Sequence, residues 1–328
     1  MKGYIEGFIN QLEKAYEIGV STEFKIKDKK ISNVLICGLG GSGIGGAIVA
    51  KFAQSRAKIP FSICNDYHIP TFVNEETLVI ASSYSGDTEE TLTAVKEAQN
   101  KGAEISAVTS GGELKDICES NGYNYITIPG GDPPRTCIGF SLTEQIFILI
   151  KYGILNSSVL DELQSAISLL KLNSEIAKDE ADNVAEVLVN KLLVIYSVDQ
   201  YEPVSMRFRQ QLNENSKELC WHQKFPELNH NEIVGWASGN SNMAVVIMRN
   251  EDDYYRTKER IEFMKKVVKE KGASITEIWS KGDTFLEKAL YLIYLTDWVS
   301  LFIANKKGVD PIEIRVIDAL KDHLATIK

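Results

Sequence analysis

Two segments rich in glycine and hydroxyl side chains stand directly after apolar runs of the chain. The first, GLGGSGIGG at residues 38–46, follows the apolar run 33–37. The second, SSYSGDTEET at residues 82–91, begins at the end of the expected strand 77–82, just after the apolar run 78–80. An apolar run that ends in such a turn and continues into a helical pattern is typical of a strand–turn–helix unit. The free N–H groups at the start of the helix in such a unit can bind an anion.

The hydroxyl groups of the second segment indicate which anion it binds. Ser83, Ser85 and Thr88 lie around Gly86, which lets the backbone fold back at the expected turn. Several hydroxyl donors beside the positive end of a helix suit a phosphate dianion. We therefore interpret Ser83, Ser85 and Thr88 as phosphate ligands.

A helix cap is the alternative interpretation of the same segment. Asp87 with Glu90, or Thr88 with Thr91, has the spacing of a capping box and explains a polar helix start without a ligand. A cap needs one or two such side chains, whereas this segment offers three hydroxyls and a glycine. Phosphate binding is the favoured hypothesis.

The first segment fits more than one kind of ligand. Residues 38–43 satisfy the GxGxxG pattern, and Asp66 follows at about the spacing at which a dinucleotide-binding protein contacts a ribose. Tight packing of a helix on a strand explains the glycines equally well. A dinucleotide-binding domain has no use for the hydroxyl-rich turn, however. From the residues alone, a dinucleotide site, another anion site and tight helix packing stay open for this first segment.

Arg135 is the candidate for stabilising a developing negative charge. It lies in PPRTCIGFSL, directly after Pro133 and Pro134 and shortly before Gly139. Two prolines restrict the backbone, so the guanidinium is held in place. A fixed positive charge of this kind stabilises an oxyanion such as an enediolate. A structural salt bridge is the alternative role for this arginine.

A second group of chemically capable residues lies in the stretch 207–236. Glu214 lies among amide side chains, and His230 lies in the polar sequence ELNHNEIVGW. Taken alone, such a glutamate is more often solvated or salt-bridged, and a single loop histidine is more often structural. Their assignment to catalysis needs a further argument.

Strand and helix patterns alternate along the chain, which predicts an α/β fold with parallel sheets covered on both faces. Ligands of such sheets bind at the carboxyl ends of the strands, where both segments lie. A polar helical stretch separates two α/β lobes. We expect an N-terminal domain at residues 1–155, a helical connection at 156–190 and a C-terminal domain at 191–328.

The two lobes share an internal repeat. NKGAEISAV at residues 100–108 and EKGASITEI at 270–278 each end a helix and begin a strand, with glycine suited to the helix C-cap. The repeat predicts two related α/β/α sandwiches. The second lobe has RNEDDYYRT, residues 249–257, where the first has SYSGDTEET, so we expect one phosphate site per chain.

Composition limits the classes of partner and compartment. A net charge of −9 and a pI near 5.2 argue against a nucleic acid or an anionic membrane as the main partner. The five cysteines are dispersed and the histidines number four, so neither a disulfide framework nor a metal site is predicted. The apolar helix at 284–304 contains Glu287, Lys288 and Asp297, which favours a buried helix over a membrane span. We expect a soluble protein of the reducing cytoplasm.

The two segments together resemble the sugar isomerase (SIS) domain, which binds the phosphate of a phosphosugar with a Ser/Thr-rich loop. Over nearly its whole length the chain is similar to the bifunctional phosphoglucose/phosphomannose isomerase family, which is built from two SIS domains. The similarity rests on these motifs: GLGGSGIGG, SSYSGDTEET, PPRTCIGFSL, NENSK, ELNHNEIVGW and VDPIEIRVIDALKDHL.

The resemblance implies a role for each candidate residue. It implies Glu214 as the catalytic base, His230 as the ring-opening group, Arg135 as the enediolate-stabilising group and Lys321 as the active-site lysine of the C-terminal tail. It implies that the phosphate ligands are Gly41, Ser42, Ser83, Ser85 and Thr88. It also implies a homodimer in which His230 is contributed by the neighbouring subunit.

The implied reaction interconverts glucose 6-phosphate and fructose 6-phosphate, and also accepts mannose 6-phosphate. One carboxylate moves a proton between two carbons through a cis-enediol, a reaction that needs neither a metal nor a redox cofactor. A non-catalytic phosphosugar sensor is the alternative hypothesis, because SIS domains also occur in regulators.

Overall fold

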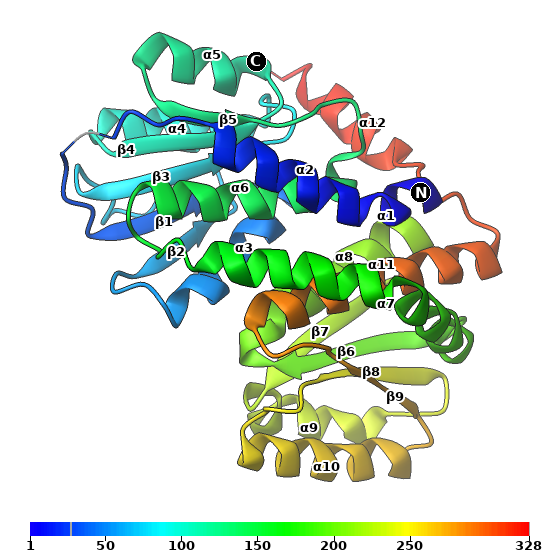
Figure 1. Ribbon diagram of the computed structural model, residues 1–328. Helices are drawn as coiled ribbons and strands as arrows, with labels where there is room; N and C mark the ends of the chain where they lie inside the picture. The colour runs from blue at the N-terminus through cyan, green and yellow to red at the C-terminus, as the bar shows by residue number, and fades with distance from the viewer. Residues whose placement is uncertain (27, 328) are drawn as a thin grey trace. The chain divides into compact units, whose positions relative to one another are not determined.

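The structure is a computed structural model that describes residues 1–26 and 28–327. The chain divides into two compact units, each built on its own sheet (Figure 1). We call them the first lobe and the second lobe. The first lobe comprises residues 6–172 and 282–290, and the second comprises residues 1–5, 173–281 and 291–328.

The first lobe contains a five-stranded parallel sheet in the order β2-β1-β3-β4-β5. Its central strands are continuous apolar runs because both faces of the sheet are covered. The strands are β1 (Asn33–Cys37), β2 (Phe61–Cys64), β3 (Thr77–Ser82), β4 (Glu104–Thr109) and β5 (Asn124–Thr127). The parallel sheet predicted from the sequence is confirmed.

Helices cover both faces of the first sheet (Figure 1). A core cluster that includes Leu35, Val79 and Val95 packs α4 and α5 against one face. The remaining helices, α2, α3 and α6, pack against one another on the other face. The helices of this lobe are α2 (Phe8–Ser21), α3 (Gly40–Gln54), α4 (Glu89–Asn100), α5 (Gly112–Asn121), the 3₁₀ turn η1 (Pro134–Thr136) and α6 (Ile138–Lys151). Helix α1 (Lys2–Glu6) precedes them, and all but its last residue belong to the second lobe.

The sequence pattern predicts a helix from Leu142 to about Gly153, whereas α6 begins four residues earlier, at Ile138. Gly139, expected to lead into the helix, lies in its first turn instead. Its N–H donates to Gln11 Oε1 at 2.7 Å, and a Cβ at Gly139 would lie 2.5 Å from the same oxygen. A side chain at this position would displace the Gln11 amide, a contact with α2 that the sequence pattern alone does not reveal.

The second lobe contains a four-stranded parallel sheet in the order β7-β6-β8-β9. The strands are β6 (Leu192–Val198), β7 (Cys220–Phe225), β8 (Met243–Arg249) and β9 (Ser274–Trp279). The helical elements are α7 (Val159–Leu188), η2 (Asp199–Tyr201), α8 (Glu202–Ser216), η3 (Glu227–His230), α9 (Glu232–Gly235), η4 (Trp236–Ser238), α10 (Tyr255–Glu270), α11 (Phe285–Lys307) and α12 (Arg315–Leu324). Helices α7 and α11 each contribute residues to both lobes.

The two faces of the second sheet carry different elements (Figure 1). Helix α10 and the segment from η3 to η4 cover one face, where Leu228, Trp236 and Met264 join the core cluster of the sheet. Helix α8 connects β6 to β7 over the opposite face. The chain moves from β6 to β7 in one direction and from β7 to β8 in the other, so right-handed crossovers place the two connections on opposite faces of the sheet.

The lobes repeat one topology. The order β2-β1-β3-β4 of the first sheet corresponds to β7-β6-β8-β9 of the second. Gly102 and Gly272, the glycines of the two Lys-Gly-Ala sequences, have φ angles of +72° and +77°. The predicted internal repeat is therefore present in the fold.

The change from the first to the second lobe at residue 173 lies inside α7. The finer domain bounds at residues 155 and 190 stay a prediction. Among the described residues no helix combines the length and the apolar character needed to span a membrane.

Candidate active site

The glycine-rich segment 38–46 and the hydroxyl-rich segment 82–91 follow two neighbouring strands of the first sheet. Strands β1 and β3 are neighbours, and the chain leaves β1 for α3 on one face and β3 for α4 on the other. This is the switch point of a doubly wound sheet, the usual ligand position of such folds. Residues 38–46 and 82–91 therefore lie beside each other at the carboxyl edge.

Hydrogen bonds join the predicted phosphate ligands directly. The Ser42 hydroxyl accepts a bond from the Tyr84 N–H at 3.1 Å, which links the two segments. Ser83 Oγ and Thr88 Oγ1 lie 2.8 Å apart, and Ser83 Oγ also accepts from the Gly86 N–H at 3.1 Å. Three of the four predicted hydroxyl groups thus lie in one cluster.

The fourth hydroxyl is more exposed. Ser85 Oγ accepts from the Asp87 N–H at 3.2 Å and supports the turn from its solvent side. Gly86 lies in the turn itself with a φ of +82°, and a Cβ there would overlap the Gly111 carbonyl oxygen. The tight turn that presents Ser83 and Thr88 therefore depends on glycine at this position.

The acidic residues of the segment do not form the capping box considered above. In the described part of the chain no side chain caps α4, although Thr88 occupies the N-cap position. The Asp87 carboxylate accepts instead from the Glu113 N–H at 2.9 Å, at the start of α5. The hydroxyl of Thr88 contacts Ser83, as the phosphate interpretation requires.

Arg135 lies directly beside the glycine-rich segment. It is in η1 and only 4% of its surface is exposed. A Cβ on Gly41 would lie 2.7 Å from the Pro134 carbonyl oxygen and 3.1 Å from Arg135 Cα. Gly41 therefore lets the backbone at Arg135 approach the start of α3, which also carries Ser42. We call Gly41, Ser42, Ser83, Ser85, Thr88 and Arg135 the phosphate cluster.

The second lobe holds Glu214 on a firmly anchored helix. Asp297 accepts hydrogen bonds from Arg207 Nη2 at 2.6 Å and Gln211 Nε2 at 3.0 Å, so α8 is tied to α11. Glu214 is half-buried and lies on the next turns of the same helical face. From the sequence, Asp297 was interpreted only as an interruption of an apolar helix. A single carboxylate within such a helix is the sequence feature that indicates a buried partner, here Arg207 and Gln211 of α8.

The end of α8 is also tied to the C-terminal tail. Ser216 Oγ donates to the Ser300 carbonyl at 2.6 Å, and Lys217 Nζ donates to the Glu313 carbonyl at 2.8 Å. Helix α12, which carries the exposed Lys321, begins two residues after Glu313. These hydrogen bonds therefore connect the end of α8, which carries Glu214, to the segment just before the helix that carries Lys321.

A network of aromatic side chains fixes the segment that carries His230. Glu232 Oε1 accepts from Tyr196 Oη at 2.6 Å and from Trp221 Nε1 at 2.9 Å. Trp236 Nε1 donates to Tyr196 Oη at 2.9 Å. His230, two residues before Glu232, ends η3 and is exposed to solvent. The network holds a short irregular segment in place while the imidazole faces outwards.

The structure does not bring Glu214 and His230 together within one chain. Strands β6 and β7 are parallel, so α8 runs back and ends at the amino edge of the sheet, where Glu214 lies. His230 follows the carboxyl end of β7, on the face opposite α8. The six residues of β7 separate these edges by about 20 Å.

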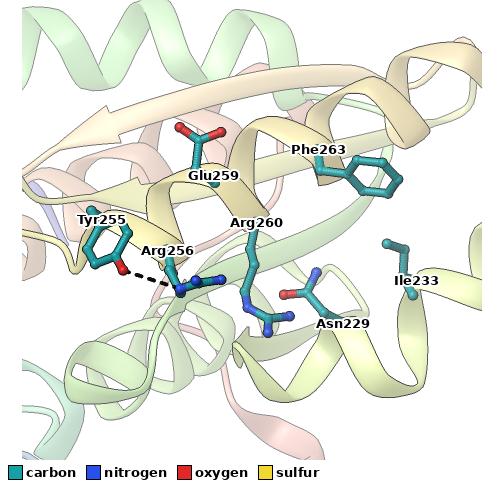
Figure 2. Close-up of a pocket in the computed structure, with 7 residues that line it drawn as sticks. All are labelled: Asn229, Ile233, Tyr255, Arg256, Glu259, Arg260 and Phe263. Atoms are coloured by element: carbon teal, nitrogen blue, oxygen red, sulfur yellow. Dashed lines mark hydrogen bonds between the residues drawn. The ribbon is translucent and has the colours of Figure 1, made fainter.

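A groove runs beside the His230 segment (Figure 2). It encloses about 600 Å³ between Asn229 and Ile233 on one side and helix α10 on the other. In Figure 2 the side chains of Arg256 and Arg260 extend toward Asn229. The groove also includes Tyr255 and Phe263, whose side chains are largely exposed.

Comparisons with known proteins place this fold in one class. A family model described as the bacterial phospho-glucose isomerase C-terminal SIS domain matches residues 177–324. The C-terminal domain of glucosamine-fructose-6-phosphate aminotransferase from Francisella tularensis has a TM-score of 0.74 at 17% identity, covering 94% of this chain and 98% of that chain. The protein is therefore of the SIS class, with an α/β domain in each lobe.

Two curated relatives define the family within that class. The bifunctional phosphoglucose/phosphomannose isomerase of Caldicellulosiruptor bescii is 39% identical, covering 97% of this chain and 97% of that protein. The enzyme of the same name from Aquifex aeolicus is 33% identical, covering 98% of this chain and 97% of that protein. The chain belongs to the bifunctional phosphoglucose/phosphomannose isomerase family.

Proposed function

We propose that this protein is an aldose–ketose isomerase that interconverts glucose 6-phosphate and fructose 6-phosphate and also accepts mannose 6-phosphate. The observation that carries the proposal is the phosphate cluster of the first lobe, found in a chain of this family. Ser42, Ser83 and Thr88 surround the turn at the switch point of the sheet. The relatives named above give no support to a non-catalytic sensor.

Anchoring by phosphate explains how one site accepts both aldoses. The starts of α3 and α4 supply N–H groups and the positive ends of two helix dipoles. The hydroxyl groups add donors without extra positive charge, which suits a chain of net charge −9. With the phosphate fixed, rotation about the C2–C3 bond presents either C2 epimer to the same base.

The proposed chemistry divides between a base, a cation and a ring-opening group. Glu214 removes the carbon proton from one sugar carbon and returns it to the next through a cis-enediol. Arg135, buried and beside Ser42, stabilises the enediolate oxygen. His230, whose side-chain type titrates near neutrality, assists opening of the cyclic sugar. Lys321 contributes a further positive charge from the tail.

A homodimer reconciles these roles with the second lobe. Glu214 and His230 lie at opposite edges of one sheet, so His230 acts on the sugar bound by the neighbouring copy. The groove beside His230 supports this location for the subunit contact (Figure 2). Its exposed aromatic residues Tyr255 and Phe263 offer apolar area, and Arg256 and Arg260 suit the acidic surface of a second copy.

The cytoplasm is the compartment that fits this chemistry. All five cysteines are free thiols, and four of them are buried, an arrangement typical of a protein kept in a reducing environment. The substrates of the proposed reaction are intracellular sugar phosphates.

A coupled assay tests the proposed activity. Fructose 6-phosphate formation is measured from glucose 6-phosphate and, separately, from mannose 6-phosphate, after treatment of the protein with a chelator. We expect both aldoses to be converted, and the chelator to have no effect because a carboxylate base carries the proton. Saturable binding of sugar phosphates without turnover would contradict the proposal and favour a sensor.

A further inference from the structure

Two cysteines face each other at the base of the phosphate cluster. Cys37 ends β1 and Cys64 ends β2, and the two are direct partners in the parallel register of these strands. Both side chains belong to the same core cluster and so lie on the same face of the sheet. Cys37 is 1% exposed and Cys64 is 5% exposed. The function proposed above leaves this pair without a role.

The geometry permits a covalent bond between the two sulfur atoms. Neighbouring strands lie about 4.8 Å apart, which falls within the Cα–Cα separation of about 4.4–6.8 Å found in disulfides. Cys64 Sγ donates to the carbonyls of Asp66 and His68, each at 3.4 Å. The two sulfur atoms can therefore be joined by a local adjustment of the strand ends.

The environment makes one of the two thiols reactive. The hydrogen bond from Cys37 lowers the pKa of the Cys64 thiol to about 6, although burial opposes this change. The same hydrogen bond and burial raise the pKa of Cys37 well above its ordinary value. Cys64 is thus the more readily ionised thiol of the pair, and the thiolate is the form that reacts in disulfide formation.

The strand ends are joined directly to the phosphate cluster. The Gly38 N–H donates to the Cys64 carbonyl at 3.2 Å, and Asn65 Nδ2 donates to the Gly38 carbonyl at 2.5 Å. Gly38 opens the glycine-rich segment that carries Gly41 and Ser42. A change in the spacing of β1 and β2 is therefore transmitted to the start of α3.

We propose that Cys37 and Cys64 form a reversible disulfide that weakens sugar-phosphate binding at the adjoining phosphate cluster. This inference rests on the proposed function of that cluster. A disulfide brings the sulfur atoms to about 2.05 Å, closer than any non-bonded contact. The ends of β1 and β2 are drawn together, and Gly38 moves with them.

Hydrogen peroxide is a sufficient oxidant for the step. The Cys64 thiolate attacks one peroxide oxygen, an S–O bond forms, the O–O bond breaks and the departing hydroxide takes up a proton as water. The Cys37 sulfur then attacks the sulfenic sulfur, so that the S–S bond forms and the S–O bond breaks. The hydroxyl leaves with the Cys37 proton as a second water. Two thiols lose two electrons, and one peroxide becomes two water molecules.

Mass spectrometry of peroxide-treated protein tests the bond. After treatment the remaining thiols are alkylated in denaturant, and we expect two of the five cysteines to resist alkylation and one peptide pair to link Cys37 to Cys64. A dithiol reductant should release the pair. Cys64→Ser should abolish the link, whereas Cys118→Ser, in the same core cluster, should leave it intact. Absence of the linked peptides in the wild-type protein overturns the proposal.

Calorimetric titration with glucose 6-phosphate tests the consequence without relying on turnover. We expect oxidation to raise the Kd by about threefold or more, with recovery after reduction and no change in Cys64→Ser. A linked peptide pair with an unchanged Kd would overturn the effect on binding. If the untreated wild-type protein does not bind glucose 6-phosphate, the proposed function fails, while the peptide analysis still decides whether the bond forms.

Discussion

Hydroxyl groups, rather than lysines, make up most of the phosphate cluster. Ser42, Ser83 and Thr88 are partly or fully buried; Ser83 and Thr88 hydrogen-bond to each other, and Ser42 accepts from the Tyr84 N–H. Each hydroxyl can both donate and accept, so the group keeps its hydrogen bonds when no anion is bound. A buried lysine in the same place would need a counter-charge. The cluster is therefore ready to bind without a large electrostatic cost.

Removal of two hydroxyls tests the phosphate role at the residue scale. In Ser83→Ala/Ser85→Ala we expect the KM for glucose 6-phosphate to rise about tenfold or more, because donors to a charged group are lost. Steady-state kinetics measures the change. Thr93→Ala is the control, since its hydroxyl bonds to the Glu89 carbonyl inside α4. An unchanged KM in the double variant would refute the assignment.

Residue types alone suggested Ser83, Ser85 and Thr88 as candidate phosphate ligands, but not how they are held. Three hydroxyls around Gly86 signalled an anion site because capping does not need so many. The contacts Ser42–Tyr84 and Asp87–Glu113 join segments 42 and 26 positions apart, so no local pattern predicts them. Glu214 and His230 were assigned through family resemblance, because an isolated glutamate or histidine has no distinctive spacing.

At the scale of the element, continuous apolar runs made the strands predictable. Strands β1 and β3 have the predicted bounds, since burial on both faces leaves a run with no polar residue inside. Helix starts were less predictable. Helix α6 begins earlier than expected, and the N–H in its first turn bonds to Gln11, a residue far away in the sequence.

The turn between β3 and α4 gives a prediction about stability. In Gly86→Ala the new Cβ would overlap the Gly111 carbonyl oxygen and the residue would keep a positive φ, so we expect a loss of roughly 3 kcal/mol or more. In Gly122→Ala the φ is also positive but nothing lies within 4 Å, so we expect a loss of about 1 kcal/mol.

Denaturant unfolding measures both variants. We also expect Gly86→Ala to raise the KM for sugar phosphates, whereas Gly122→Ala should not, because only the first lies in the turn that presents Ser83 and Thr88. Equal losses of stability in the two variants would show that the close approach to Gly111 does not constrain the turn.

At the scale of the whole molecule, the two copies of the fold carry different candidate residues. The first lobe keeps the hydroxyl-rich turn after its β3 strand, and the corresponding turn of the second lobe is RNEDDYYRT. The second lobe instead carries Glu214 on an anchored helix and His230 on a braced segment. These two residues lie at opposite edges of one sheet, so the account requires a second copy of the chain.

Mixing two inactive variants tests this requirement most directly. Glu214→Gln lacks the base and His230→Ala lacks the ring-opening group, so each alone should be nearly inactive on the cyclic sugar. After unfolding and refolding together, half of the sites in a mixed dimer combine an intact Glu214 with the partner copy's intact His230. We predict recovery of about one quarter of the wild-type activity per chain. A mixture no more active than the sum of its two components would contradict the account.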